Sequence, residues 1–315
     1  MNKTGFIYHT DYLKHNTGPL HPESPQRLTA IMEHLERGSI MSRLVKIDPH
    51  PADRPWIERI HPIEYIEEIN NSSPSESEGL RYLDPDTPIS FYSYKTALLA
   101  VGGLLTAVDK IMDGDINNAF CAIRPPGHHA EPRRAMGFCL FNNIAVAARY
   151  IQIHYLLKKI LIIDWDAHHG NGTQDIFYDD PTVMYFSIHQ YPHYPGTGST
   201  KERGVGKGDG FTINVPMQGG VGDKEYIHAF EERLRPTAEV FEPDFILISA
   251  GFDAHIDDPL AGMKVTDEGF GELTRIVKGI AKRYCDGRIV SALEGGYNLN
   301  ALARSVERHL SILID

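Results

Sequence analysis

Short runs of consecutive apolar residues recur along the chain and are separated by longer segments of helical character. The runs are rich in Ile, Val, Leu and Phe. Uninterrupted apolarity over so short a length is typical of strands that are buried on both faces of a parallel sheet. The predicted strands are AFCAI (119–123), ILII (160–163), VMYFSI (183–188), FTINV (211–215), FILIS (245–249) and IVSAL (289–293).

Helical segments lie between these runs, and this alternation predicts an α/β protein with helices on both faces of one parallel sheet. A length of 315 residues allows two small domains or one large one. The polar stretch 70–79 has the composition of a linker, but it is short and little strand signal precedes it. We therefore expect an exposed loop there and a single domain over residues 1–315. The predicted helices are 93–112, 141–157, 223–240, 266–284 and 300–313.

Composition and charge exclude several classes of protein. The chain has 31 Lys and Arg residues against 42 Asp and Glu residues, a net charge of −11, which argues against nucleic acid or an anionic membrane as the main partner. Cys121, Cys139 and Cys285 are too few and too scattered for a disulfide framework or a cysteine-based zinc site. The longest nearly apolar run, 97–108, is too short to span a bilayer, and the N-terminus lacks a signal-peptide pattern. We expect a cytoplasmic protein.

The unusual polar residues all follow predicted strands. RPPGHHAE comes after 119–123, DWDAHHGNG after 160–163, AGFDAHIDDP after 245–249 and EGGYN after 289–293. In open parallel sheets, ligand sites lie outside the carboxyl ends of the strands. We therefore expect these four clusters to meet in one site.

Asp166 and His168 are two residues apart, so both can face one point in an extended or turning segment. Asp253, after a different strand, completes a set of two carboxylates and one imidazole. Three protein ligands and an open fourth position are typical of a catalytic zinc ion, although such a set also accepts iron(II) or cobalt. The alternative is that Asp166 and His168 only cap the next helix or pair locally.

The adjacent His128 and His129 follow a stiff RPPG turn and are candidates for a general base toward water and a general acid toward a leaving amine. Asp164 and Asn171 are candidate partners for their second ring nitrogens. Tyr297 follows two glycines and can donate a hydrogen bond to an oxyanion. With a metal ion, these groups predict attack of water on a polarised carbonyl. The alternative is that these residues have no catalytic role: His128 and His129 would be surface histidines in a loop, and Tyr297 would only contribute to packing.

The motifs RPPGHHA, GFCLFNN, DWDAHHGNGTQ, GFDAHIDDPL and LEGGYN closely resemble those of the zinc-dependent histone deacetylase superfamily, in particular its class II and bacterial members. The segment HTGPLHPESPQRL (15–28 without Asn16) is also similar, and the resemblance runs from about His9 to Arg304. It implies the arginase/deacetylase fold, an α/β domain with a central eight-stranded parallel sheet. It also implies an amide hydrolase that removes acetyl or related acyl groups from the ε-amino group of lysine.

The resemblance assigns catalytic roles to the same residues. His129 would be the main general base and acid, with His128 assisting electrostatically. Asp164 would orient His128, Asn171 would orient His129, and Tyr297 would polarise the acyl carbonyl. The implied ligands of one catalytic zinc ion are Asp166, His168 and Asp253.

The resemblance also implies a substrate site and structural potassium ions. Phe138 and Tyr194 would form the aromatic walls of a tunnel for the acyl chain, and the Gly137 carbonyl would accept the substrate amide proton. Asp86 resembles the rim carboxylate that grips the substrate backbone. Potassium would bind partly through backbone carbonyls, at Asp164, Asp166, His168, Ser187 and Ile188 in one site and near Phe177, Asp180, Val183 and Phe211 in a second.

The chain departs from the family pattern at two positions. Asn171 stands where class I enzymes have Asp, which should leave His129 a weaker base because the charged imidazolium loses a counter-ion. Tyr194 stands where Phe is commoner and adds a hydroxyl at the tunnel wall.

Alternative functions stay open at this level. An acetylpolyamine amidohydrolase of the same superfamily is one, and the acidic net charge and Glu131 favour a cationic substrate. Polyamine-selective eukaryotic relatives place Glu where this chain has Leu260, which favours lysine. A manganese ureohydrolase of the arginase branch would need carboxylates where Gly170 and His255 stand. A catalytically inactive acyl-lysine binding protein would not need Tyr297 or the histidine pair, and a homo-oligomer is also left open.

Overall fold

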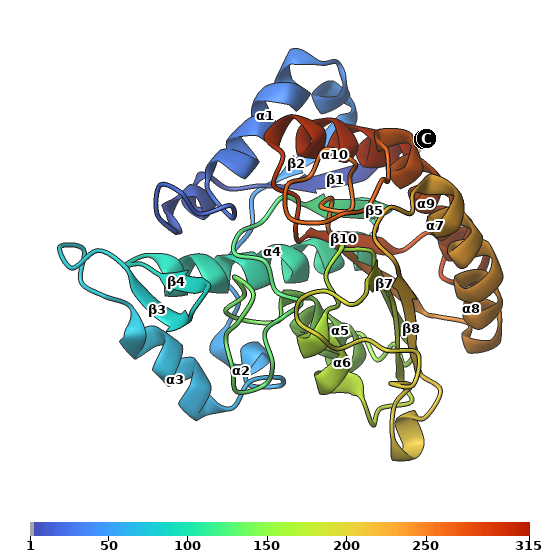
Figure 1. The fold of residues 1–315 in the computed structure, drawn as a ribbon, viewed down its shortest axis with the longest axis horizontal. Helices are drawn as coiled ribbons and strands as arrows, with labels where there is room; N and C mark the ends of the chain where they lie inside the picture. Colours follow the sequence, from blue (N-terminus) through green and yellow to red (C-terminus); the bar gives the residue numbers. More distant parts are fainter. Residues whose placement is uncertain (1–2) are drawn as a thin grey trace.

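The central element of the computed structural model, which describes residues 3–315, is an eight-stranded sheet whose neighbouring strands are all parallel (Figure 1). The strand order is β2-β1-β5-β10-β9-β6-β7-β8. The α/β class and the eight-stranded parallel sheet are thereby confirmed. The strands are β1 (Thr4–Ile7), β2 (Leu44–Ile47), β5 (Asn118–Cys121), β6 (Ile160–Asp164), β7 (Val183–Gln190), β8 (Thr212–Met217), β9 (Phe245–Ala250) and β10 (Ile289–Leu293).

Helices cover the sheet on both sides. In Figure 1, α1, α9 and α10 lie on one side, while α4, α5 and α6 lie on the other. A separate antiparallel pair, β3 (Arg81–Asp84) and β4 (Thr87–Ile89), precedes α4. The α-helices are α1 (Gln26–Arg37), α2 (Arg54–Ile57), α3 (Ile63–Ser72), α4 (Ser93–Met112), α5 (Asn143–His154), α6 (Asn171–Phe177), α7 (Asp223–Ala229), α8 (Arg235–Phe241), α9 (Asp267–Tyr284) and α10 (Leu299–Ile314).

The predicted helix over 223–240 is interrupted in the structure. Helices α7 and α8 are joined by a π-helical stretch, Phe230–Leu234. Pro236 near the start of α8 has no backbone N–H to donate, so the hydrogen-bonding pattern changes just before it. The prediction of an exposed loop over 70–79 is wrong at its start, because α3 continues to Ser72.

The apolar run 97–108 lies within α4, a core helix with most of its residues buried. Within residues 3–315, no helix combines the length and the apolarity that a membrane span requires.

The chain path places the carboxyl ends of β6 and β9 at a crossover point. The two strands are neighbours, but the chain continues from β6 to β7 on one side and from β9 to β10 on the other. Connections that leave in opposite directions open a crevice at the carboxyl ends of the two strands. Both loops of this crevice carry the candidate metal ligands.

Candidate functional site

Three side chains from two loops form a compact set of potential metal ligands. Asp166 and His168 follow β6, Asp253 follows β9, and one ligand atom from each lies within 4.8 Å of the other two. His168 Nδ1 lies 3.1 Å from Asp166 Oδ1 and 2.9 Å from Asp253 Oδ2. Both carboxylates are buried, while the imidazole is 11% exposed.

Backbone groups hold the remaining oxygens of the two carboxylates. The N–H of Gly295 donates to Asp166 Oδ2 at 2.8 Å, and the N–H of Ala167 donates to Asp253 Oδ1 at 2.7 Å. A Cβ atom on Gly251 would lie 2.2 Å from Asp166 Oδ2. Each carboxylate therefore packs against backbone atoms through one oxygen. Its other oxygen lies next to the His168 imidazole.

The electrostatics of this set fit a divalent cation. Burial and the adjacent Asp166 carboxylate raise the pKa of Asp253 above its usual value. Among the described residues, no lysine or arginine forms an ion pair with either carboxylate. Two buried carboxylates need a positive charge, and two oxygens with one imidazole nitrogen are ligands that zinc accepts.

The two adjacent histidines each donate one ring N–H to a buried partner. His128 Nδ1 donates to Asp164 Oδ2 at 3.0 Å, and His129 Nδ1 donates to Asn171 Oδ1 at 2.8 Å. The ring centroids lie 4.0 Å apart. Tyr185 also donates its hydroxyl to Asp164 Oδ2, at 2.9 Å. The structure thus brings each histidine to the partner expected from the sequence.

The two histidines have opposite preferences for the proton. Burial alone would lower the pKa of His128, but the carboxylates of Asp164, Asp166 and Glu294 outweigh burial and raise this pKa to about 10. Burial and the neighbouring charge of His128 hold the pKa of His129 well below its usual value. A charged His128 beside a neutral His129 leaves the second imidazole free to accept a proton.

Tyr297 lies in the loop after β10 and is held through its backbone. Its N–H donates to Asp258 Oδ2 at 2.7 Å, and the Arg27 guanidinium lies 5.1 Å from its ring centroid. Burial and the nearby Asp253 carboxylate raise the pKa of the phenol well above its usual value, so the phenol keeps its proton. Within residues 3–315, its hydroxyl makes no hydrogen bond, which leaves the proton available to a ligand.

Two aromatic side chains from different loops flank these groups. The Phe138 ring lies 5.9 Å from the Tyr297 ring, while the Tyr194 ring lies 5.2 Å from His129. Tyr194 is 37% exposed, so it stands at the solvent side. Leu260 is connected to the site through His193, which donates to the Leu260 carbonyl at 3.1 Å and stacks on His168 at 5.0 Å.

Asp86 faces the protein backbone in this structure. Its Oδ1 accepts the N–H of Gly137 at 3.1 Å and the hydroxyl of Thr87 at 2.7 Å. The Gly137 carbonyl accepts the Cys139 thiol at 3.2 Å. A carbonyl oxygen has two lone pairs, so one remains for a ligand.

The residues predicted for potassium are engaged in protein contacts. Ser187 Oγ lies 2.8 Å from His189 Nδ1. The Asp180 carboxylate pairs with Arg149 at 2.6 Å, and the same guanidinium lies 4.7 Å from the Phe177 ring centroid. At the second predicted site, arginine therefore neutralises the carboxylate. Val183, Phe211 and Ile188 offer backbone carbonyls, and potassium stays a prediction at both places.

A second metal ion of the arginase type has no carboxylates at the corresponding positions. A Cβ atom on Gly170 would lie 2.3 Å from Asp164 Oδ2, which leaves no room for a larger side chain. His255 Nδ1 accepts the Asp257 N–H at 3.0 Å, and its Nε2 lies 3.3 Å from Asp267.

Sequence reasoning missed two acidic residues that support the site, Glu294 and Asp258, and considered a third, Glu131, only as an attractor of cationic substrates. Glu294 Oε2 accepts the N–H groups of Gly127 and His128 at 2.7 and 3.2 Å. Glu131 accepts the Asn171 amide at 2.9 Å, and Asp258 holds the loop of Tyr297. Glu294 and Asp258 belong to LEGGYN and GFDAHIDDPL, so motif membership was the available signal.

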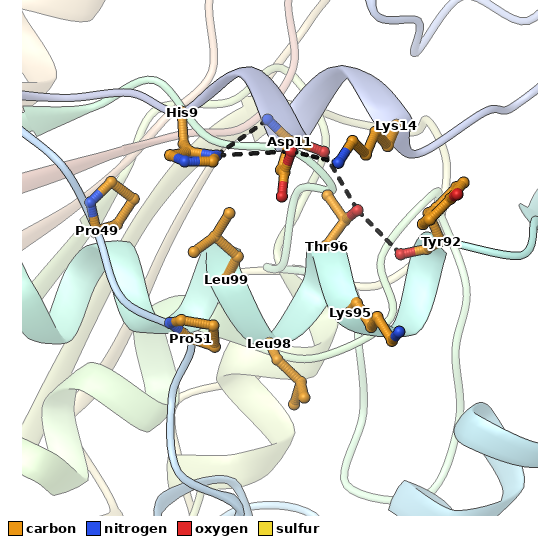
Figure 2. A pocket seen from close by; sticks show the side chains of 10 residues that line it. All are labelled: His9, Asp11, Lys14, Pro49, Pro51, Tyr92, Lys95, Thr96, Leu98 and Leu99. Carbon is orange, nitrogen blue, oxygen red and sulfur yellow. Dashed lines mark hydrogen bonds and ion pairs between the residues drawn. The ribbon is translucent and has the colours of Figure 1, made fainter.

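A cavity of about 450 Å³ lies apart from these groups, beside residues that follow β1 and β2 (Figure 2). Asp11 in its wall pairs with Lys14 at 2.6 Å and lies 3.9 Å from His9. The cavity shares no lining residue with the metal-ligand set.

Comparisons with known proteins agree with this geometry. Residues 21–313 match the model of the histone deacetylase domain. A probable deacetylase of Archaeoglobus fulgidus is 41% identical over 298 residues, which is 94% of this chain and 82% of that protein. Histone deacetylase 5 of Arabidopsis thaliana is 39% identical over 330 residues, but the chain spans only 49% of its length. The crystal structure of the HDA15 HD domain superposes with a TM-score of 0.94 at 38% identity and covers 99% of this chain and 88% of that one.

Proposed function

Since the chain belongs to the histone deacetylase family, we propose that it is a zinc-dependent lysine deacylase with one catalytic domain. It would remove acetyl or related acyl groups from the ε-amino group of lysine in proteins or peptides. One observation carries the proposal. A metal-ligand set, a charged and a neutral histidine, and a free tyrosine hydroxyl meet at the carboxyl ends of four neighbouring strands, β5, β10, β9 and β6.

Asp166, His168 and Asp253 would hold the zinc ion, which when bound supplies Lewis acidity toward the acyl carbonyl and the attacking water. His129 takes the proton of water, because it is neutral while its Nδ1–H stays with Asn171. It then gives this proton to the leaving amine. His128 stays charged, and its charge favours the negative charge that develops on the acyl oxygen.

Tyr297 donates its hydroxyl to the acyl oxygen, since its raised pKa keeps the phenol protonated. A donor aimed at the developing oxyanion typically accelerates such a reaction by 10²–10³-fold. Phe138 and Tyr194 would flank the acyl chain. The Phe138 ring lies beside Tyr297, and the Tyr194 ring lies beside His129.

The second candidate is an acetylpolyamine amidohydrolase. Leu260 argues for lysine, because it places an apolar side chain where polyamine-selective relatives have a carboxylate. Glu131 is weaker support for a cationic substrate than the sequence indicated, because its carboxylate already accepts a hydrogen bond from Asn171. We also propose a structural potassium ion near Asp164, whose wholly buried carboxylate belongs to a strand paired with β7, the strand that carries Ser187 and Ile188.

The test compares turnover of an acetyl-lysine peptide with turnover of an acetylated polyamine by zinc-loaded protein. We expect faster cleavage of the peptide and a loss of about 10²–10³-fold in Tyr297→Phe. Tyr284→Phe on α9 is the matched control and should keep full activity. Faster cleavage of the polyamine would replace lysine with polyamine as the substrate. Full activity of Tyr297→Phe would contradict the role of the phenol, and cleavage of neither substrate would reject the deacylase.

A further inference from the structure

Asp86 and Thr87 hold two consecutive backbone N–H groups of the segment that carries Phe138. The Gly137 N–H donates to Asp86 Oδ1 at 3.1 Å, and the Phe138 N–H donates to Thr87 Oγ1 at 3.1 Å. The Thr87 hydroxyl in turn donates to Asp86 Oδ1 at 2.7 Å. One carboxylate oxygen and one hydroxyl thus form a closed set of three hydrogen bonds.

The held backbone has an unusual conformation. Gly137 and Phe138 have φ angles of +56° and +70°. A non-glycine residue with a positive φ is strained and persists only where its surroundings hold it. Because the two N–H groups are fixed by Asp86 and Thr87, these residues supply such support.

The same turn packs directly against the candidate base. A Cβ atom on Gly137 would lie 2.3 Å from Cδ2 of His129 and 2.7 Å from its Cγ. The Cα atom of Gly137 is therefore packed against the His129 side chain, with no room between them for a side chain on residue 137. Any shift of this turn moves the surface on which the His129 ring rests, as well as the Phe138 ring.

We propose that Asp86 and Thr87 form a clamp that positions the Gly137–Phe138 turn, and through it His129. Both are positioning residues for the deacylase reaction, so their kinetic effect rests on the proposed function. The clamp would affect the reaction in two ways. It fixes the backbone that packs against His129, and it fixes the Phe138 ring beside Tyr297.

This role differs from the substrate grip that the family resemblance implies for Asp86. A grip needs contact with the substrate and involves only Asp86, which is partly exposed. Thr87 is wholly buried and cannot touch a substrate. The Thr87 hydroxyl bonds both Asp86 and the Phe138 N–H. Its loss would affect a grip only through Asp86 and hence through KM, whereas the clamp predicts a lower kcat, so variants of Thr87 separate the two roles.

The experiment measures kcat and KM on an acetyl-lysine peptide for Thr87→Val, Thr87→Ser, Asp86→Ala and Asp86→Asn. The clamp predicts that Thr87→Val and Asp86→Ala both lower kcat by about 10- to 100-fold, since small displacements of reacting groups cost that much. Thr87→Ser and Asp86→Asn keep the hydroxyl and the accepting oxygen, so both should recover most of the activity. Thr106→Val on α4, which also removes a hydroxyl bonded to a carbonyl, is the control and should keep kcat.

A grip by Asp86 alone gives a different pattern. Thr87→Val would then keep the wild-type kcat, and both Asp86 variants would raise KM with little change in kcat. That pattern would overturn the clamp.

Hydrogen exchange followed by mass spectrometry tests the clamp without turnover. The amides of Gly137 and Phe138 should exchange slowly in the wild type and in Thr87→Ser, and faster in Thr87→Val and Asp86→Ala. Unchanged exchange would reject the clamp. If the wild type fails to cleave the peptide but the exchange rates change as expected, the deacylase proposal fails while the structural clamp stands.

Discussion

Asn171 sets the basicity of His129 with a neutral side chain. Its Oδ1 accepts the imidazole N–H, while its Nδ2 donates to Glu131 at 2.9 Å. The amide therefore has a defined orientation, with its oxygen toward the histidine. At its Nδ1, an imidazolium at His129 would face an amide and not a carboxylate. The neutral form of His129 is therefore favoured.

Asn171→Asp should raise the pKa of His129, since a carboxylate stabilises the imidazolium. A base must be unprotonated to act, so the acidic limb of the kcat/KM profile should move to higher pH, by about one unit. The profile is measured between pH 5 and 9 on the acetyl-lysine peptide.

Glu131 opposes this change because it lies beside the new carboxylate. The double variant Asn171→Asp with Glu131→Gln removes the repulsion and should show the full shift. Glu131→Gln alone is the matched control. An acidic limb that stays in place in the double variant would contradict the proposed role of His129.

At the scale of single residues, sequence motifs could predict the side chains that perform chemistry but could not predict what holds them. The pairing of His128 with Asp164 follows from the expected convergence of residues at the carboxyl ends of the strands, although β10 and β9 lie between β5 and β6. By contrast, the N–H groups of Gly295 and Ala167 hold the metal-binding carboxylates, and backbone donors leave no trace in residue identity. The clamp on Gly137 depends in the same way on a backbone turn.

At the scale of elements, the loops after β9 and β10 are joined by one buried carboxylate. Asp258 Oδ2 accepts the N–H groups of Tyr297 and Asn298 at 2.7 and 3.3 Å. Its Oδ1 accepts the Leu260 N–H at 2.9 Å. The loop that carries Tyr297 is therefore attached to the loop that carries Asp253.

Asp258→Asn should displace Tyr297, because the new amide group presents a donor to a backbone N–H. We expect kcat to fall by about 10- to 100-fold while zinc content stays at the wild-type value. Steady-state kinetics and metal analysis of the same preparation check this. Asp257→Asn, an exposed neighbour, is the control, and equal losses in both variants would contradict the argument.

Elements with long or strongly apolar signals could be predicted, whereas short strands with few apolar residues could not. The six predicted strands all occur, and α4 has the predicted bounds. Strand β1 was missed because Thr4 and Gly5 leave it only two large apolar residues, and β2 because Val45 and the charged Lys46 are exposed at the sheet edge. Helix α1 was also missed, although Leu28, Ile31 and Leu35 have helical spacing.

At the scale of the whole molecule, several histidines are buried in the neutral form. Burial and the Arg124 charge lower the pKa of His15 to about 3. Burial lowers the pKa of His61 to about 4 and that of His309 to about 3. All three lie outside the metal-ligand set, so their titration concerns the stability of the fold.

The free energy of unfolding should fall as the pH drops below about 6.5. Above this pH both states are neutral at these positions; below it only the unfolded chain takes up protons, until the pH approaches 3 to 4. Each histidine then costs about 1.4 kcal/mol per pH unit. Urea unfolding at several values between pH 7.5 and 5 measures the slope.

His61→Gln should reduce that slope, because glutamine does not take up a proton in the unfolded chain. The folded chain should be kept, since glutamine can donate to the Pro132 carbonyl and accept the Asn142 N–H as His61 does. His50→Gln is the control, because His50 is exposed in the folded chain. A slope that is the same for the wild type and His61→Gln would show that His61 does not contribute.

The backbone that packs against the carboxylates of Asp166 and Asp253 also limits which substitutions this site can accept. A methyl group on Gly251 or Gly295 would overlap Asp166 or Asp253, so the inner wall of the site tolerates no side chain. Natural or directed selection for a new acyl group therefore has little freedom on that side. We expect tolerated substitutions in the outer segments instead, such as those of Phe138 and Tyr194, whose rings lie beside Tyr297 and His129. We therefore expect the inner wall to tolerate fewer substitutions than the outer segments.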